Sequence, residues 1–266
     1  MYKLLKGDCL ELMNNIPDNS IDLILCDLPY DCDKTRAKWD NLIDIDCLFG
    51  QYRRIVKSKG VIVLFGNEPF SSKLRLNGLD LYKYDIKWVK NIQTGFANAN
   101  YRPMNKYEDV LVFSFANAST GGKSNAMTYN PQGLIPVNKT KKNRSNRHGL
   151  IMKDTNNTGT NNSLLQDGSI YVQKYTNYPS NVVYFDIDTH RVHPTQKPVA
   201  LLEYLIKTYT NEGNLVLDNC MGSGSTGVAA LNTGRNFIGM ELDEKYFEVA
   251  KERIENIYNN INNNVI

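Results

Sequence analysis

The sequence lacks the features of a membrane-spanning or exported protein. No apolar run approaches the roughly 20 residues that cross a bilayer. Residues 1–12 carry charges inside their apolar stretch and no small-residue cleavage site, so we expect no secretory signal. Its five cysteines form no Cys-x-x-Cys pair and have no histidine at metal-ligand spacing, which indicates reduced thiols rather than zinc ligands. We therefore expect a cytoplasmic protein with no membrane contact and no metal.

The chain also lacks an internal repeat, but its texture changes along its length. At 266 residues, 41% hydrophobic and 22% charged, it is long enough for one sizeable core. Residues 114–192 are rich in Asn, Ser, Thr and Gly, and their nine basic and four acidic residues give +5 in a chain of net charge +3. A basic, polar insertion in a mildly acidic scaffold suits contact with phosphates, although a solvated lysine-rich loop has the same composition.

Apolar and helical patterns alternate on both sides of this insertion. Short apolar runs predict strands at 21–26, 61–65, 110–113, 215–217 and 236–240. Helical spacing predicts helices over 49–56, 199–209, 225–232 and 244–258. Strands that alternate with helices indicate an α/β fold, in which a parallel sheet is covered on both faces.

A glycine-rich loop, Gly222 to Gly227, follows the strand predicted at 215–217 and opens a helix. Glycines let a backbone turn sharply and approach a ligand closely. Glu241 lies 19 residues after Gly222, at the end of the next predicted strand, where a carboxylate can bind the hydroxyls of a ribose. The loop therefore predicts an adenosine-bearing cofactor, NAD or S-adenosylmethionine. No lysine follows the glycines, so a Walker loop is excluded.

The position of the loop favours S-adenosylmethionine. Only 39 residues follow Gly227, which leaves room for one more strand and a long helix. A dinucleotide-binding domain that began there would lack most of its sheet. The other strands must come from earlier in the chain, which predicts a circularly permuted sheet. An NAD-dependent dehydrogenase is the alternative enzyme.

The sequence Asp27-Leu28-Pro29-Tyr30 leaves the carboxyl end of the strand predicted at 21–26, where open parallel sheets place their active sites. Pro29 holds Leu28 in extended geometry, so a carboxylate, a carbonyl and an aromatic ring share one small arc. The Asp27 carboxylate and the Leu28 carbonyl would accept both hydrogens of a nucleobase amino group and localise its lone pair for attack on a methyl sulfonium. Tyr30 would stack on that base, which must first be flipped out of its duplex.

Methylation of cytosine at carbon 5 is disfavoured, because that chemistry needs a cysteine nucleophile after a proline. None of the nine prolines here precedes a cysteine.

Taken together, the motifs resemble the beta class of amino-group DNA methyltransferases, in which the catalytic motif precedes the cofactor loop. Asp27–Tyr30 resembles its D-P-P-Y motif, with Leu28 in place of the first proline. The cofactor loop Asp218–Thr226 resembles D-P-F-x-G-S-G-T-T, with Asn219 and Cys220 in place of Pro-Phe. Three shorter segments also resemble family motifs. His193–Pro198 resembles the cofactor-side motif, and Gly239–Asp243 resembles the ribose-binding turn. Gly7–Cys9 resembles the N-terminal segment whose acid contacts the adenine of the cofactor.

The resemblance implies a Rossmann-like methyltransferase fold with a circularly permuted, mostly parallel seven-stranded sheet and helices on both faces. A catalytic part at 1–113 and an S-adenosylmethionine-binding part at 193–266 would form one domain, with an inserted target-recognition region at 114–192. The implied catalytic residues are Asp27, Leu28, Pro29 and Tyr30. The implied cofactor-binding residues are Asp8, Cys9, Thr195, Lys197, Pro198, Asp218, Asn219, Cys220, Met221, Gly222, Ser223, Gly224, Ser225, Thr226, Glu241 and Leu242.

The implied activity is site-specific methylation of adenine N6 in double-stranded DNA. An aspartate at the start of the catalytic motif resembles the adenine enzymes, since cytosine-N4 enzymes more often start with serine. Cytosine-N4 methylation and a DNA-binding module without catalysis are the alternatives, and intact Asp27 and Tyr30 argue against the second. The target sequence, a homodimer and a cognate restriction endonuclease are left open.

DNA contact is expected from the basic insertion and from the loop that follows the catalytic corner. The loop residues are Lys34, Arg36, Lys38 and Trp39, and the insertion residues are Lys139, Lys141, Lys142, Arg144, Arg147 and His148.

Overall fold

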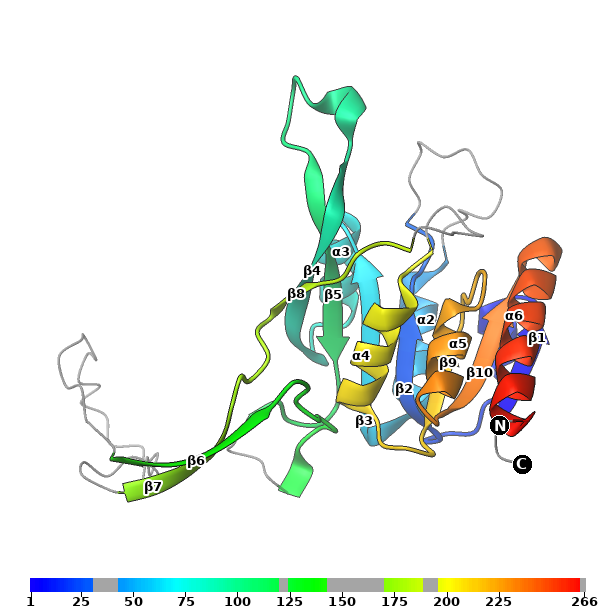
Figure 1. The fold of residues 1–266 in the computed structure, drawn as a ribbon. Coiled ribbons are helices and arrows are strands. Elements are labelled where there is room, and N and C mark those ends of the chain that lie inside the picture. Colours follow the sequence, from blue (N-terminus) through cyan, green and yellow to red (C-terminus); the bar gives the residue numbers. More distant parts are fainter. Residues whose placement is uncertain (31–42, 120–123, 143–169, 189–195, 264–266) are drawn as a thin grey trace. The chain divides into compact units, whose positions relative to one another are not determined.

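The computed structural model describes residues 1–30, 43–119, 124–142, 170–188 and 196–263 (Figure 1). It divides into a larger unit, Met1–Asn130 with Ser180–Ile266, and a smaller unit, Pro131–Pro179. Eight of the predicted site residues lie outside the described ranges: Lys34, Arg36, Lys38, Trp39, Arg144, Arg147, His148 and Thr195.

The smaller unit contains fewer residues than the insertion predicted at 114–192, because both ends of that insertion belong to the larger unit and hydrogen-bond within it. The backbone nitrogen of Asn130 donates to the Thr208 carbonyl at 2.7 Å. On the other flank, the Trp88 indole donates to the Phe185 carbonyl at 2.8 Å.

The larger unit is built on an eight-stranded sheet in the order β1-β10-β9-β2-β3-β5-β4-β8 (Figure 1). Strand β5 is antiparallel to both its neighbours, and all the other pairs are parallel. The C-terminal strands β9 and β10 lie between the N-terminal β1 and β2, which is the expected permutation. The strands are β1 (Tyr2–Lys6), β2 (Ile21–Cys26), β3 (Val56–Gly66), β4 (Tyr82–Thr94), β5 (Asn105–Phe113), β8 (Val182–Tyr184), β9 (Leu215–Asp218) and β10 (Asn236–Glu241).

The mostly parallel sheet confirms the fold expected from the sequence, with one strand more than the seven expected. The extra strand is β8, which continues the sheet by pairing with β4, Val183 opposite Trp88. Its three residues lie within the polar zone, where no apolar run of useful length marked a strand.

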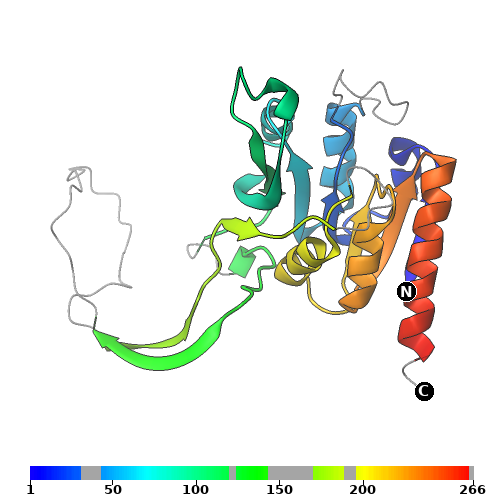
Figure 2. The same ribbon diagram turned by 45° about the horizontal axis from the view of Figure 1, so that its top comes forward.

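Helices cover both faces of the sheet, as the strand pattern requires. Alternate residues of β2 point to opposite faces, so Leu23 and Leu25 pack with α4, α5 and α6, while Ile24 and Cys26 pack with α1, α2 and α3. Figures 1 and 2 show these two layers. The helices are α1 (Cys9–Met13), α2 (Ile45–Ile55), α3 (Phe70–Asn77), α4 (Val199–Tyr209), α5 (Ser225–Asn232) and α6 (Glu244–Asn263), with a short 3₁₀ turn η1 (Phe96–Asn98).

Among the described helices, none is long and apolar enough to cross a membrane.

The smaller unit consists of the antiparallel pair β6 (Ile135–Lys142) and β7 (Ile170–Thr176). Nearly all residues of both strands are exposed. A two-stranded ribbon buries little apolar surface, so its own stability is marginal.

The topology brings the two sequence motifs together. Strand β2 pairs in parallel with β9, Ile24 opposite Leu217, so their carboxyl ends lie at the same edge of the sheet. The Asp27–Tyr30 corner leaves β2 at that edge, and the glycine-rich loop leaves β9 beside it.

Candidate active site

The catalytic corner follows directly from the end of β2. Leu28 is buried at 2% exposure and anchors the corner, while Tyr30 is half-buried. The Tyr30 hydroxyl donates to Asp27 Oδ1 at 2.9 Å. The Tyr30 ring lies 5.1 Å from the ring of Phe70 on α3 at an angle of 30°. The carboxylate and the aromatic ring predicted to act together are therefore in direct contact.

Lys197, which was predicted to bind the cofactor, instead contacts the Asp27 carboxylate. Its Nζ lies 2.5 Å from Asp27 Oδ2 and 3.2 Å from Glu108 Oε2. Glu108 also pairs with Lys90, and the Lys197 ammonium lies 5.1 Å from the centre of the Phe65 ring. Only 8% of the Lys197 side chain is exposed, so two ammonium groups and two carboxylates balance one another in a largely buried cluster.

The cluster determines the charge of each member. Burial raises the pKa of Asp27, and the Lys197 ammonium only partly offsets this effect. Burial opposes ionisation of Glu108, but Lys197 and Lys90 lower its pKa below the usual value. Burial opposes the charge of Lys197 as well, and the Asp27 and Glu108 carboxylates raise its pKa. The arrangement keeps Lys197 protonated while Asp27 is the carboxylate most ready to take a proton.

The pKa of Tyr30 lies well above its ordinary value, because burial of the hydroxyl and the neighbouring Asp27 carboxylate both oppose its ionisation. Its hydroxyl therefore stays a donor at neutral pH.

Glu241 holds the glycine-rich loop from the end of β10. Its Oε2 accepts from the backbone nitrogen of Gly222 at 2.9 Å, and its Oε1 accepts from that of Asp243 at 2.8 Å. Burial raises the pKa of Glu241. A Cβ added at Gly222 would meet no atom within 4 Å, so the loop is open at this position. Leu242, the residue after Glu241, is 63% exposed and offers an apolar surface.

Two other glycines of the loop serve the packing of α6. Gly224 has φ of +80°, and a Cβ there would lie 2.9 Å from Ala250 Cβ. A Cβ at Gly227 would lie 2.5 Å from Ile254 Cδ1. Close approach of a helix, rather than of a ligand, therefore requires glycine at both positions.

Arg253 of α6 ties the same loop down with its guanidinium. Nη1 donates to the backbone carbonyl of Ser223, to Ser223 Oγ at 3.0 Å and to Ser225 Oγ at 3.3 Å. The side chain of Gln196 accepts from Ser223 Oγ at 3.4 Å. Neither Arg253 nor Gln196 was predicted as a site residue.

The polar start of the loop is buried. Asp218 Oδ1 accepts from the backbone nitrogen of Cys220 at 3.1 Å, and burial raises the pKa of Asp218 to about 7. Asn219, which replaces the proline of the resembled family, accepts a hydrogen bond from the Tyr52 hydroxyl at 2.7 Å. A side-chain hydrogen bond with Cys220, together with burial, raises the pKa of the Cys9 thiol. The Tyr52 hydroxyl thus provides a hydrogen-bond partner for Asn219, which is polar where the family motif has a proline.

The remaining predicted cofactor residues lie at the same edge. The Asp8 carboxylate caps α1 by accepting from the Leu10 nitrogen at 2.7 Å, and the Gly7 nitrogen donates to the Glu241 carbonyl at 3.0 Å. Met221 donates to the Met240 carbonyl at 2.9 Å. Cys9, Thr226 and Pro198 are buried near the ends of α1, α5 and α4.

These residues fit an adenosine-bearing cofactor. Glu241 lies next to an open glycine backbone, Asp8 is brought beside it by the pairing of β1 with β10, and an exposed leucine follows. The assignment of each residue to the cofactor stays a prediction.

Sequence reasoning missed Glu108, Lys90 and the two rings that flank the corner, Phe65 and Phe70. Glu108 belongs to no recognised motif and is far from Asp27 in the chain. The one available signal was the acidic pair Glu108-Asp109 immediately before an apolar strand.

Comparisons with known proteins agree with this geometry. The family model described as DNA methylase matches residues 21–252. The DNA adenine methyltransferase YhdJ of Escherichia coli (strain K12) is 29% identical over 262 residues, covering 95% of this chain and 82% of that protein. The type II methyltransferase M.HinfI of Haemophilus influenzae is 28% identical over 286 residues, covering 97% and 70%.

Solved structures show the same fold. The M1.HpyAVI–SAM complex superimposes with a TM-score of 0.58 at 26% identity, covering 95% of this chain and 100% of that one. The cytosine-N4-specific PvuII DNA methyltransferase gives 0.64 at 17% identity, covering 98% and 94%. With the Asp27–Tyr30 corner beside the glycine-rich loop and a family match over residues 21–252, the chain belongs to the DNA methylase family.

Proposed function

We propose that the chain transfers a methyl group from S-adenosylmethionine to the exocyclic N6 of an adenine flipped out of double-stranded DNA. The observation that carries the proposal is the contact of Asp27 with Tyr30 at the end of β2, beside the glycine-rich loop of the neighbouring strand β9. This arrangement supplies an amino-group acceptor and a stacking ring next to a nucleoside site.

The corner residues have distinct tasks in this proposal. The Asp27 carboxylate and the Leu28 carbonyl accept the two hydrogens of the amino group, which localises the nitrogen lone pair. Tyr30 stacks on the adenine ring, and Phe70 supports the other side of Tyr30. Pro29 limits the freedom of the corner, so that the acceptors are already in place before the base arrives.

Lys197 occupies one acceptor before the base binds. Its ammonium contacts Asp27 Oδ2, and Tyr30 contacts Oδ1, so both carboxylate oxygens have partners. Each oxygen keeps a second lone pair, so an incoming amino group can bind beside these partners. Glu108 lies 3.2 Å from the same ammonium and can retain Lys197 when Asp27 turns to the base.

Bound S-adenosylmethionine would supply a methyl group on a positively charged sulfur, and transfer would form an N–C bond as the C–S bond breaks. The amino nitrogen must then lose a proton. Asp27 is suited to accept it, because burial raises the pKa of its carboxyl group. Asp8, Glu241 and the loop Asp218–Thr226 would hold the cofactor.

Adenine is favoured over cytosine by the names of the relatives. YhdJ is a DNA adenine methyltransferase, whereas the cytosine-N4-specific PvuII enzyme, at 17% identity, supports the fold alone. The aspartate at position 27 agrees with this preference.

The smaller unit, with the flanking residues of 114–192, is proposed to recognise the target. Lys139, Lys141 and Lys142 are exposed on β6 and suit phosphate contact. Residues Lys34 to Trp39 keep their proposed role beside the flipped base. We also propose that the chain forms a homodimer and acts in the cytoplasm. Its similarity to type II methyltransferases supports a cognate restriction endonuclease as a further partner.

Expression in cells without adenine methylation tests the function. Sequencing that detects modified bases should find N6-methyladenine at one defined sequence with the wild-type chain and none with Asp27→Asn. Asp46→Asn, an exposed carboxyl on α2, is the matched control and should methylate normally. N4-methylcytosine would establish the alternative specificity, and full methylation by Asp27→Asn would overturn the role of the corner.

A further inference from the structure

A long hairpin leaves the sheet beside the active site and ends in exposed aromatic residues. We call residues 91–107 the arm: they comprise the end of β4, η1 and the start of β5. Phe96 and Tyr101 at its tip are 82% and 89% exposed, and Tyr107 and Ile92 are 50% and 43% exposed. Single exposed apolar side chains are ordinary, but four of them on one projecting hairpin are the kind of exposed group that marks an interaction site.

The tip is ordered by its own backbone. Gly95 turns the chain with φ of +92°, and the nitrogens of Tyr101 and Arg102 both donate to the Asn98 carbonyl, at 2.9 and 3.0 Å. The two strands pair as far as Thr94 opposite Asn105. The aromatic rings are therefore presented on a folded turn rather than on a loose loop.

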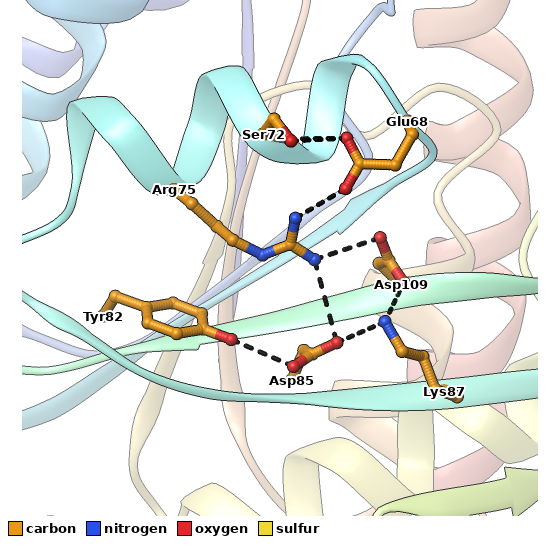
Figure 3. A network of polar contacts seen from close by, with 7 residues as sticks. All are labelled: Glu68, Ser72, Arg75, Tyr82, Asp85, Lys87 and Asp109. Atoms are coloured by element: carbon orange, nitrogen blue, oxygen red, sulfur yellow. Dashed lines mark hydrogen bonds and ion pairs between the residues drawn. The ribbon is translucent and has the colours of Figure 1, made fainter.

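The base of the arm is held by the polar network in Figure 3. Arg75 of α3 contacts Glu68 at 2.7 Å and Asp109 at 3.2 Å. Lys87 contacts Asp109 at 2.6 Å, and the Tyr82 hydroxyl donates to Asp85 at 2.9 Å. These contacts join α3 to both strands of the arm and resist its displacement.

The arm carries positive charge only. Between Ile86 and Tyr107 the sequence has four basic residues and no acidic one. Lys87 and Lys90 are paired with carboxylates at the base. Of the two nearer the tip, Arg102 and Lys106, neither forms an ion pair with any residue that the structure describes.

The arm rises from the edge that holds the active site. Gly66, the last residue of β3, pairs with Asp109, so residues 105–108 of β5 continue beyond the carboxyl ends of the parallel strands. Glu108 contacts the Lys197 that pairs with Asp27. At about 3.3 Å per residue, the tip begins roughly 10 Å from Glu108. Figure 1 shows the arm projecting past α3 at this edge.

We propose that the arm is a duplex-contacting wedge that acts when the target base leaves the helix. Phe96 and Tyr101 insert against the base stack opened by flipping, and Arg102 and Lys106 contact the adjacent phosphates. The inference rests on the proposed function, since it assumes that a duplex delivers a base to Asp27. Apolar and aromatic wedges between bases are an established way of stabilising an opened duplex.

A DNA duplex is favoured over a protein partner by position and charge. A base that reaches Asp27 leaves the rest of its duplex outside this edge, where the arm projects. The unpaired cations complement phosphate, and aromatic rings beside basic residues suit stacked bases.

The test compares Phe96→Ala/Tyr101→Ala with the wild-type protein on two duplexes that carry the methylation site, once that site has been identified by sequencing. One duplex is fully paired, and in the other the target base is mispaired and already loosened. We expect the variant to lose about tenfold or more in methylation rate on the paired duplex, the effect of losing a base–aromatic stack. On the mispaired duplex we expect most of that loss to disappear, because less opening is required.

Leu79→Ala is the matched control, since Leu79 is 65% exposed just before β4, at the opposite edge of the sheet. It should match the wild type on both duplexes. An unchanged rate in the double variant would overturn the wedge, and so would an equal loss on both duplexes. Failure of the wild-type chain to methylate any DNA would instead refute the proposed function.

A second measurement addresses the cations. The slope of log duplex affinity against log salt concentration should become shallower by about 1.8 in Arg102→Ala/Lys106→Ala. This is about 0.9 for each phosphate contact that is lost. An unchanged slope would show that neither residue meets a phosphate.

Discussion

At the residue scale, Lys197 and Glu108 connect the cofactor half of the site to the catalytic corner. Lys197 lies two residues before α4, and its partner Asp27 lies 170 residues earlier. Glu108 contacts Lys197 from β5, the strand that continues into the arm. Glu108 does not touch the reacting atoms in the proposed mechanism. We therefore regard it as a positioning residue that controls where the Lys197 ammonium lies.

Glu108→Gln should lower kcat by at least about tenfold and leave the KM for DNA nearly unchanged, because the buried ammonium groups of Lys197 and Lys90 would then share only the Asp27 carboxylate. Loss of the carboxylate also removes one group that raises the pKa of Lys197. The alkaline limb of the pH–rate profile should therefore move to lower pH.

Glu108→Asp, which retains the charge, should recover part of the activity. Glu248→Gln changes an exposed carboxyl on α6 and should alter neither parameter. A kcat equal to that of the wild type in Glu108→Gln would contradict the positioning role.

Asp218 makes stability depend on pH. Burial raises its pKa to about 7 in the folded state, against about 3.9 in an unfolded chain. The folded state binds the proton more tightly, so the stabilisation is fully present below about pH 4 and is lost as pH rises through about 7. The loss amounts to on the order of 4 kcal/mol.

Asp218→Asn removes this titration. The free energy of unfolding, measured in urea at pH 5 and pH 8, should fall less with pH in the variant than in the wild type. Asp46→Asn should follow the wild-type trend. Parallel curves for Asp218→Asn and the wild type would show that Asp218 does not carry the effect.

At the element scale, the glycine-rich loop does two jobs that its sequence does not separate. Gly224 and Gly227 let α6 pack closely, whereas Gly222 has open space beside it, where we propose that the nucleoside binds. Arg253 of α6 then holds Ser223 and Ser225. Packing of a C-terminal helix thus shapes the loop that would bind the cofactor.

Gly224→Ala should lower the free energy of unfolding by about 2–4 kcal/mol, because positive φ and the clash with Ala250 both oppose it. Gly222→Ala should cost only about 1–2 kcal/mol from its positive φ, and should weaken binding of S-adenosylmethionine more than it weakens the fold. Urea unfolding and cofactor titration measure the two effects. Equal destabilisation by both variants would contradict the division of tasks.

At the scale of the whole molecule, charge is divided between the two units. Lys139, Lys141 and Lys142 lie exposed on the smaller unit, whereas the residues proposed to bind the cofactor belong to the larger unit. They should contribute to DNA affinity without affecting cofactor affinity.

Replacement of all three lysines by alanine should weaken duplex binding similarly for target and non-target sequences. The slope of log affinity against log salt should become shallower by about 2.7, for three phosphate contacts. Alanine at Lys3, Lys59 and Lys251, exposed on the larger unit, provides the control and should leave the slope nearly unchanged. Loss of S-adenosylmethionine binding in the β6 variant would argue against a pure DNA-contact role.

The local sequence was sufficient to predict β2, α4 and α5, whose observed bounds match the predicted ones. Each has a dense apolar pattern, and α5 and β2 adjoin strong motifs. Strands β1 and β4 were missed, because polar and charged residues interrupt their apolar positions. Strand β4 forms the arm with β5, so the sequence pattern did not indicate the proposed wedge.

The sequence by itself determined the family, the permuted order of the motifs and the Asp27–Tyr30 corner, because each depends on residues that are close in the chain. Only the tertiary structure placed Lys197 on Asp27, brought Glu108 to Lys197 and gave Asn219 its hydrogen-bond partner Tyr52. Those contacts join residues from different strands and helices. The order of strands in the sheet determines which residues lie close together. Burial then requires their polar and charged side chains to pair with one another.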